Sequence, residues 1–274
     1  MKKLYLSIAL IAFLVAAPTS SGNKFTVRDF FELEYASDPQ ISPDGKRVVY
    51  VRNFADIMTD RRYSNLWIVN SNGSDNRPLT SGHRNDRSPR WSLDGSKLIY
   101  VSNMEGSSDI YMKWMDSGEI ARLTNLRYSP SNIIWSPNGK IIAFNMFVKK
   151  PSDSMTKMPE KPDGAKWADP PKVIEKMIYR SDGSGYRENG FIHIFSLPAE
   201  GGTPRQITSG DYNHDGLLQW IPNGSELIFS ANRRDDWEYE GRDSEVYKIS
   251  LNDGELKKIT NRRGPDSSPV LSPN

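Results

Sequence analysis

The chain has 274 residues, of which 36 are lysine or arginine, 34 are aspartate or glutamate, three are histidine and none is cysteine. The formal charge is +2, and Lys2 and Lys3 account for the whole excess. Beyond these two residues the chain is neutral, and it therefore lacks the basic excess of nucleic-acid and anionic-membrane binders. The absence of cysteine excludes disulfide scaffolds, thiolate zinc sites and cysteine nucleophiles.

The N-terminus has the pattern of an export signal. After Lys2 and Lys3 comes an apolar run at residues 4–17, followed by small residues. A run of about 14 residues suits a signal peptide and is shorter than the roughly 20 residues that span a bilayer. We therefore expect a signal peptide at residues 1–21, cleaved near Ser21, and a periplasmic or secreted protein without a membrane attachment. An uncleaved helical anchor is the alternative.

A turn of the type Ser-Pro-Asp-Gly recurs along the chain. Its copies begin at Ser42, Ser92, Ser136 and Ile221, and a fifth begins at Ser272. The spacings are 50, 44, 85 and 51 residues, so the long interval contains either an insertion or a degenerate copy. Proline presets φ near −65°, and glycine supplies the positive φ that closes a three- or four-residue hairpin loop.

Each turn is surrounded by the same elements. One strand-like run follows it directly, at residues 47–51, 97–101, 140–144 and 226–230. A second β-rich run comes next, at residues 65–69, 109–115, 191–197 and 245–251. Each unit closes on a Leu-Thr or Ile-Thr pair, with the threonines at Thr80, Thr124, Thr208 and Thr260. The next turn begins 12 or 13 residues after each threonine, so the register holds across the long interval.

A unit of about 44 residues with several short strands is typical of one β-propeller blade. We therefore predict an all-β protein: a β-propeller of four-stranded blades, with about four blades present, the start of a fifth, and an incomplete ring. A short capped helix at residues 26–31 is expected to lead into the first blade. A two-layer β-sandwich is the alternative, but sandwiches lack such a fixed register.

The third unit carries the extra residues. Residues 149–190 are polar and rich in proline, and we interpret them as an excursion from a blade edge or from one propeller face. Because a propeller closes its ring to cover its edges, we expect residues 22–274 to be the N-terminal part of a larger propeller in a longer protein.

Tandem Ser-Pro-Asp-Gly-Lys blades behind a signal peptide resemble the propeller of the prolyl oligopeptidase family of serine peptidases, and more closely its acylaminoacyl-peptidase and dipeptidyl-peptidase branch. Residues 37–45, 170–186 and 235–247 carry this resemblance. In that family the propeller covers a C-terminal α/β-hydrolase domain with a Ser-Asp-His triad and restricts access to short peptides. The resemblance implies that this chain is the substrate-gating part of an exported serine peptidase that acts on short peptides without a cofactor.

No catalytic residue is assigned within the chain. A nucleophile elbow requires Gly-x-Ser-x-Gly, and the nearest sequence, Gly183-Ser184-Gly185, has the wrong spacing. We therefore expect the hydrolase domain to be absent from these residues and the chain to be inactive alone. The rival interpretation is a non-enzymatic, TolB-like periplasmic propeller that mediates protein–protein interaction. A continuation of about 350–400 residues with a nucleophile elbow would favour the peptidase. A continuation of only two or three further blades would favour the protein-binding propeller.

Glu238 and Glu240 are the candidate substrate-binding residues. Residues 236–240, Asp-Trp-Glu-Tyr-Glu, resemble the region near which dipeptidyl peptidases hold the free amine of the substrate. The resemblance implies that these two carboxylates bind such a cation, although Gly241 and Arg242 follow in place of further acids. The alternative is a solvated loop between strands, with Trp237 packed on a blade.

The remaining polar motifs favour simpler interpretations. His83 and His214 occupy related loops of non-adjacent units, so we expect two surface residues and no shared metal site. His193 lies in a strand, where packing is expected. The basic pairs at residues 149–150 and 233–234 are expected in solvated turns, with steering of peptide carboxylates as the alternative.

Overall fold

The computed structural model describes residues 24–151, 159–168 and 172–272, and the predicted signal peptide lies outside these residues. A short helix, α1 (Asp29–Glu32), precedes the strands and overlaps the expected helix at residues 26–31, but Arg28 at its N-terminus makes no side-chain capping hydrogen bond. The strands form four four-stranded sheets, and a separate two-stranded hairpin lies in the insertion.

All four sheets are antiparallel meanders. The first sheet contains β1 (Tyr35–Ile41), β2 (Arg47–Asp56), β3 (Arg61–Asn70) and β4 (Arg77–Pro78). The second contains β5 (Asp86–Trp91), β6 (Lys97–Ser102), β7 (Asp109–Trp114) and β8 (Ile120–Arg122). The third contains β9 (Ser131–Trp135), β10 (Ile141–Lys149), β13 (Gly190–Pro198) and β14 (Arg205–Gln206). The fourth contains β15 (Gln219–Trp220), β16 (Glu226–Ala231), β17 (Glu245–Ser250) and β18 (Leu256–Lys258). The hairpin consists of β11 (Arg180–Ser181) and β12 (Gly185–Tyr186).

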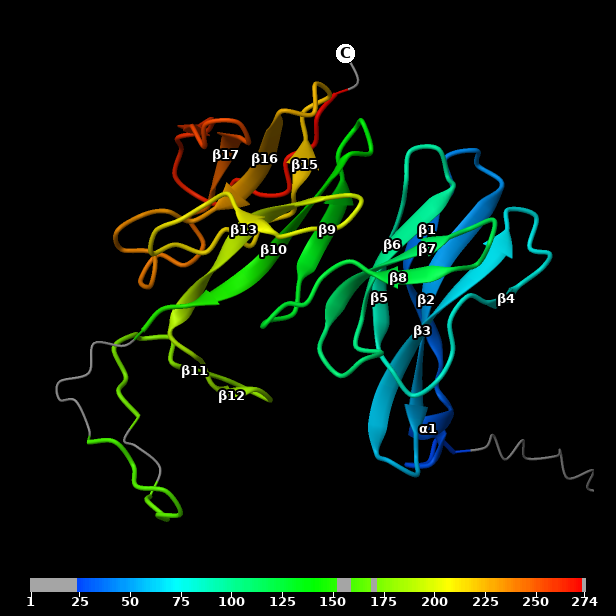
Figure 1. Ribbon diagram of the computed structural model, residues 1–274, viewed down its shortest axis with the longest axis horizontal. Coiled ribbons are helices and arrows are strands. Elements are labelled where there is room, and N and C mark those ends of the chain that lie inside the picture. Colours follow the sequence, from blue (N-terminus) through cyan, green and yellow to red (C-terminus); the bar gives the residue numbers. More distant parts are fainter. Residues whose placement is uncertain (1–23, 152–158, 169–171, 273–274) are drawn as a thin grey trace, which may run out of the picture.

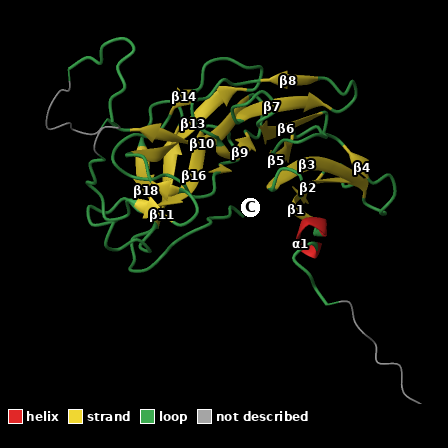
Figure 2. Cartoon of the chain, turned by 90° about the horizontal axis from the view of Figure 1, so that it is seen from below, coloured by secondary structure: helices red, strands yellow, loops and turns green. Residues whose placement is uncertain are grey.

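The sheets are the blades of a propeller. They follow one another along an arc, with β1, β5 and β9 toward its inner side and β4 and β8 toward its outer side (Figures 1 and 2). The predicted all-β propeller with four-stranded blades is confirmed, and the sandwich alternative is wrong. The described residues contain four such blades, and the long interval holds an insertion within the third.

The recurring turn joins the first and second strands of each blade. In the first blade the Ser42 hydroxyl donates to the Asp44 carboxylate (2.6 Å) and accepts from the Arg47 N–H (2.9 Å). The Ser42 N–H donates to the Arg47 carbonyl, so four residues lie between the closing pair. Gly45 has a φ of 70°, which glycine adopts without the steric cost of a Cβ. The sequence motif therefore encodes the loop through side-chain hydrogen bonds as well as backbone angles.

The closing threonines fasten the fourth strand to the third. The hydroxyls of Thr80, Thr124, Thr208 and Thr260 each accept a backbone N–H from the third strand of their blade, at 2.9–3.0 Å. In every blade the threonine follows a polar residue of the third strand at the same spacing, and these residues are Asn65, Asp109, His193 and Glu245. Thr124 also donates to Asp109 (2.8 Å), so the Leu-Thr signature marks a polar closure of the blade.

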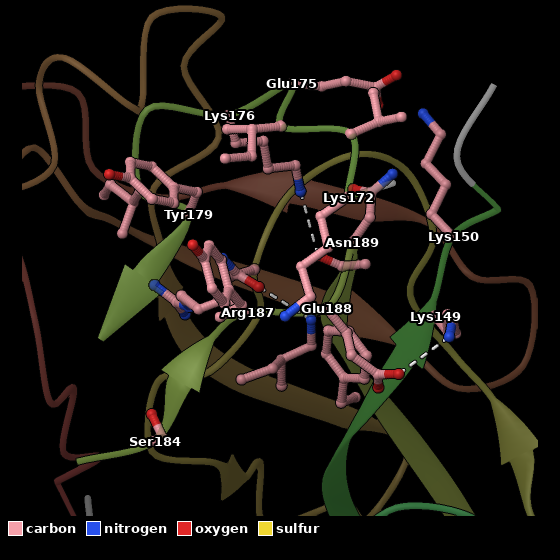
Figure 3. Close-up of a pocket in the computed structure, with 18 of the residues that line it drawn as sticks. Lys149, Lys150, Lys172, Glu175, Lys176, Tyr179, Ser184, Arg187, Glu188 and Asn189 are labelled. Atoms are coloured by element: carbon pink, nitrogen blue, oxygen red, sulfur yellow. Dashed lines mark hydrogen bonds and ion pairs between the residues drawn. The ribbon is translucent and has the colours of Figure 1, made fainter. Parts of the chain in front are cut away.

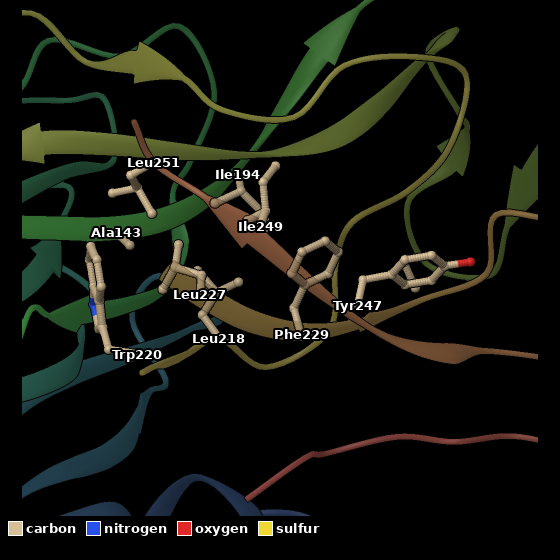
Figure 4. Close-up of a cluster of buried hydrophobic side chains, with 10 residues drawn as sticks. Ala143, Ile194, Leu218, Trp220, Leu227, Phe229, Tyr247, Ile249 and Leu251 are labelled. Atoms are coloured by element: carbon tan, nitrogen blue, oxygen red, sulfur yellow. The ribbon is translucent and has the colours of Figure 1, made fainter. Parts of the chain in front are cut away.

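The hydrophobic core lies between blades. One buried cluster joins blades one and two, a second joins blades two and three, and a third joins blades three and four. Figure 4 shows the third cluster, in which Ala143 and Ile194 of one blade meet Leu227 and Phe229 of the next. Each blade therefore depends on its neighbour for burial of its apolar face.

Indole hydrogen bonds add a polar link between neighbouring blades. The Trp91 N–H donates to the Gln40 carbonyl and the Trp135 N–H to the Arg90 carbonyl, both at 3.1 Å. Trp220 occupies the matching place in the fourth blade, but its buried N–H has no acceptor among the described residues.

Candidate functional site

The functional candidates gather at one end of the blades. The recurring turns lie at the opposite end, because each blade is an antiparallel meander. At the candidate end lie α1, the insertion that leaves β10 at Lys149 and rejoins β13 at Gly190, and the loop between β16 and β17 (Figure 1).

The insertion folds over the open end of the β10–β13 hairpin and encloses a pocket of about 750 Å³ (Figure 3). Three anchors hold it there. The Lys150 N–H donates to the Asn189 carbonyl (2.9 Å), and the Lys176 ammonium donates to the Gly190 carbonyl (3.3 Å). The Met177 N–H donates to the Glu238 carboxylate (3.2 Å), which ties the insertion to the loop of blade four.

The walls of the pocket are largely apolar and aromatic. Tyr128 and Phe147 come from the blade, and their rings meet edge to face with centroids 5.0 Å apart. Ile174, Tyr179 and Tyr186 come from the insertion and remain about half exposed. Concave, apolar surfaces with a few polar groups are the usual form of small-ligand sites.

Charge in the pocket is predominantly positive. Its lining includes five cations, Lys149, Lys150, Lys172, Lys176 and Arg187, and two carboxylates, Glu175 and Glu188. Lys149 pairs with Glu188 (2.9 Å), and Lys150 pairs with Asp211 outside the pocket (2.6 Å). The basic pair at residues 149–150 thus contributes to the pocket wall and is not simply a solvated turn.

Lys176 lies in a largely apolar setting. Its ammonium lies 3.7 Å from the ring centroid of Phe191 and 5.9 Å from that of Trp237. Burial lowers the pKa of Lys176 from its ordinary value, and the Glu238 carboxylate opposes that effect.

The two predicted substrate-binding carboxylates lie in different surroundings. Glu238 is half-buried and engaged by the Met177 N–H of the insertion. Glu240 is exposed and lines a second pocket together with Arg234 and Arg242. Trp237 packs edge to face on Phe191, as the alternative interpretation of this loop expected.

The histidines only partly follow expectation. His83 is exposed, and its imidazole lies 3.8 Å from the Asp56 carboxylate. His193 packs in the third blade, as expected, next to the Thr208 hydroxyl. The expectation that His214 is a surface residue is wrong: it is fully buried, and its ring centroid lies 5.3 Å from that of His193.

Repeat register contained a signal for the burial of His214. The sixth residue after each closing threonine is buried in all four blades, and these residues are Asp86, Pro130, His214 and Asp266. At this position the chain turns back toward the first strand of the next blade, on the inner side of the propeller. Polar residues at this position are therefore buried.

The described part of the chain contains no cluster that could hold a metal ion. Residues 24–151, 159–168 and 172–272 contain no group of three or more acidic or histidine side chains arranged to hold a metal ion. Ser184 lines the pocket, where none of the described lining residues is a histidine. Over the same residues, no helix has the length and apolar character needed to cross a membrane.

Two family models together match almost the whole chain. Residues 19–166 match the TolB beta propeller domain, and residues 156–274 match the dipeptidyl peptidase IV N-terminal region.

Individual relatives include peptidases. An uncharacterized peptidase, YuxL, from Bacillus subtilis is 29% identical over 208 residues, which are 76% of this chain and 31% of the relative. Dipeptidyl-peptidase 5 of Porphyromonas gingivalis is 24% identical over 281 residues, covering 97% of this chain and 40% of the relative. The chain therefore spans less than half of the length of the curated relatives that it matches.

Among solved structures, the Pyrococcus horikoshii acylaminoacyl peptidase superimposes with a TM-score of 0.61 at 17% identity, over 85% of this chain and 33% of that one. At this identity the likeness establishes the propeller fold alone.

Proposed function

The chain belongs to the TolB β-propeller domain family and forms an N-terminal propeller portion of the prolyl oligopeptidase type, and on that premise we propose that it gates and orients short peptides for an exported serine peptidase. The catalytic serine, aspartate and histidine would lie outside these residues. The observation that carries the proposal is the peptidase-type propeller with a ligand-sized pocket on its insertion, in a chain without a nucleophile elbow.

The architecture supports a gating role. The insertion and the loop between β16 and β17 project from the same end of the blades, and Glu238 joins them through the Met177 N–H. A covered propeller end excludes large substrates. Neighbouring blades share hydrophobic cores, so separating the blades to admit such a substrate costs free energy.

Glu238 and Glu240 remain our proposed ligands for the amine of a peptide substrate. Glu240 is exposed, so a cation reaches it without displacing a protein contact. Glu238 would exchange its contact with the Met177 N–H for one with the substrate. The substitutions Glu238→Gln and Glu240→Gln should each raise KM for a free-amine peptide and leave KM for its N-acetylated form unchanged. Equal effects on both peptides would remove this assignment.

The second candidate is a non-enzymatic propeller that binds proteins in the cell envelope. It is supported by the match of residues 19–166 to the TolB domain model. The match of residues 156–274 to a dipeptidyl peptidase region favours the peptidase, since it includes most of the insertion and residues 235–247.

Substrate length tests the gating proposal. A protein that joins this chain to the proposed hydrolase domain should hydrolyse peptides of about four to eight residues and leave an unfolded chain of about 100 residues intact, because the propeller would limit access. A variant lacking residues 172–189 should cut the long chain faster, whereas one with Arg180→Gln should not. Equal rates on both substrates in the unaltered protein would contradict gating, and binding of envelope proteins without any hydrolysis would establish the rival function.

A further inference from the structure

Three cations line the insertion pocket without an ion-pair partner among the described residues. Lys172 lies with its ammonium 4.1 Å from the ring centroid of Tyr186. Among the described residues, the Lys176 ammonium donates to the Gly190 carbonyl and faces the rings of Phe191 and Trp237, while Glu238 and Asp211 act on it as nearby charges without an ion pair. Arg187 is exposed, and its guanidinium has no hydrogen-bond acceptor in the described part of the chain.

These positive charges influence one another. Burial has the largest effect on the pKa of Lys176 and lowers it. The Glu238 and Asp211 carboxylates oppose this effect, and Lys150 and Arg187 add to it. Like charges gathered in a concave and partly apolar site destabilise one another until an anion enters. Glu188 does not relieve them, because its carboxylate is already occupied by Lys149 (2.9 Å) and by the Tyr128 hydroxyl (2.8 Å).

Aromatic and aliphatic groups surround the unpaired cations. Tyr179 and Tyr186 lie with ring centroids 6.1 Å apart, and Ile174 and Ile178 line the same pocket. An anion that matches this surface must carry an apolar body beside its charge. A planar carboxylate also matches the paired donors of a guanidinium.

We propose that this pocket binds the C-terminal carboxylate of a short peptide whose last residue is apolar. The carboxylate would lie among Lys172, Lys176 and Arg187, and the last side chain would pack on the aromatic wall. The choice of a peptide rests on the proposed function, whereas the preference for a carboxylate beside an apolar group rests on the pocket alone.

Two peptides that differ only in charge test the proposal. The chain is titrated calorimetrically with acetyl-Ala-Phe and with its C-terminal amide at low ionic strength. Charge-assisted hydrogen bonds predict that the acid binds at least about tenfold more tightly than the amide. In about 0.5 M salt the screening length is only a few ångströms. The affinity for the acid should therefore fall, and the affinity for the amide should stay nearly unchanged. Equal affinities, or no binding of either peptide at about 10 mM, would overturn the proposal.

Exposed cations of the insertion provide the matched variants. Lys172→Gln and Arg187→Gln should each weaken binding of the acid by roughly three- to tenfold and leave the amide unaffected. Arg180→Gln is the control, since Arg180 is exposed on β11 of the same insertion but does not line the pocket. Lys176 is left intact because it anchors the insertion. If the control variant and the pocket variants lost the same affinity for the acid, binding would depend on the overall positive charge of the insertion and not on this pocket. That result would overturn the proposal.

A third ligand separates peptides from other aromatic acids. 3-Phenylpropionate carries the same carboxylate and ring without a peptide unit, and we expect it to bind at least about tenfold more weakly than acetyl-Ala-Phe. Equal binding would overturn the peptide assignment in favour of small aromatic acids. These experiments measure binding to this chain, so their outcome is independent of whether a protein that includes the proposed hydrolase domain hydrolyses peptides.

Discussion

Acid should loosen the contact between blades three and four through His214. The His214 imidazole is fully buried between these blades, where Arg233 donates to its Nε2 atom and its Nδ1 atom lies 3.4 Å from the Ile192 carbonyl. This arrangement requires a neutral ring that donates from Nδ1 and accepts at Nε2. Burial, followed by the nearby charges of Arg233 and then His193, lowers the pKa of His214 to about 3.

The consequence for stability follows from linkage. An unfolded histidine titrates near 6.5, so below that pH the unfolded chain takes up a proton that the folded chain resists until about pH 3. The contribution of neutral His214 to the free energy of unfolding is fully present above pH 6.5, and it is lost as the pH drops from 6.5 toward 3. Between pH 7 and pH 5 the loss from His214 is about 2 kcal/mol. Burial also lowers the pKa of His193, which adds a loss of the same sign.

Urea unfolding at pH 7, 6 and 5, followed by tryptophan fluorescence, measures this effect. The variant His214→Asn should be less stable at pH 7 by about 1–3 kcal/mol, because it loses buried hydrogen bonds. Its stability should nevertheless fall by about 2 kcal/mol less than that of the unaltered chain between pH 7 and pH 5. His83→Asn is the control, since that side chain is 66% exposed and outside the blade contact. An unchanged pH slope in His214→Asn would refute the reasoning.

Other substitutions test how the blades are held. Thr124→Val removes the buried acceptor of the Ile110 N–H and the buried donor to Asp109. The variant should lose about 2–4 kcal/mol in the free energy of unfolding, measured by urea titration. A loss below about 1 kcal/mol would contradict the role of Thr124 in closing the blade. Trp135→Phe should reduce the free energy of unfolding by about 1 kcal/mol more than Trp220→Phe. Of these two indoles, Trp135 donates to the Arg90 carbonyl, and Trp220 has no acceptor among the described residues. Thermal unfolding compares the two variants, and equal losses of stability would disprove a stabilising role of the hydrogen bond between blades.

Much of the blade structure was predictable because its signals are local. The Ser42 turn contains its own hydrogen bonds to Asp44 and Arg47, so the six consecutive residues 42–47 encode the hairpin, and the same pattern recurs along the chain. Thr124 closes its blade on residues only 15 positions earlier, and this spacing repeats along the chain.

Burial of His214 could not be deduced from composition or from its own loop. It depends on Arg233 and Phe229 of the next blade, and contacts between blades are not encoded by short-range pattern. Only alignment of the repeats on their closing threonines places it at a buried position.

The pocket was hidden from the sequence for the same reason. It exists because Glu238 reaches the Met177 N–H and Lys176 lies on Phe191, and the first of these contacts joins residues 61 positions apart. The prediction that residues 149–190 leave the blade was possible because polar, proline-rich segments do not form core strands. Where such a segment returns to the surface depends on tertiary contacts.

Labelling with a fluorophosphonate probe tests most directly whether this propeller serves a catalytic group located elsewhere. A protein that joins this chain to the proposed hydrolase domain should be labelled covalently on a serine outside residues 22–274, and residues 22–274 produced alone should remain unlabelled. Modification of Ser184, or of any other side chain within residues 22–274, would contradict the account.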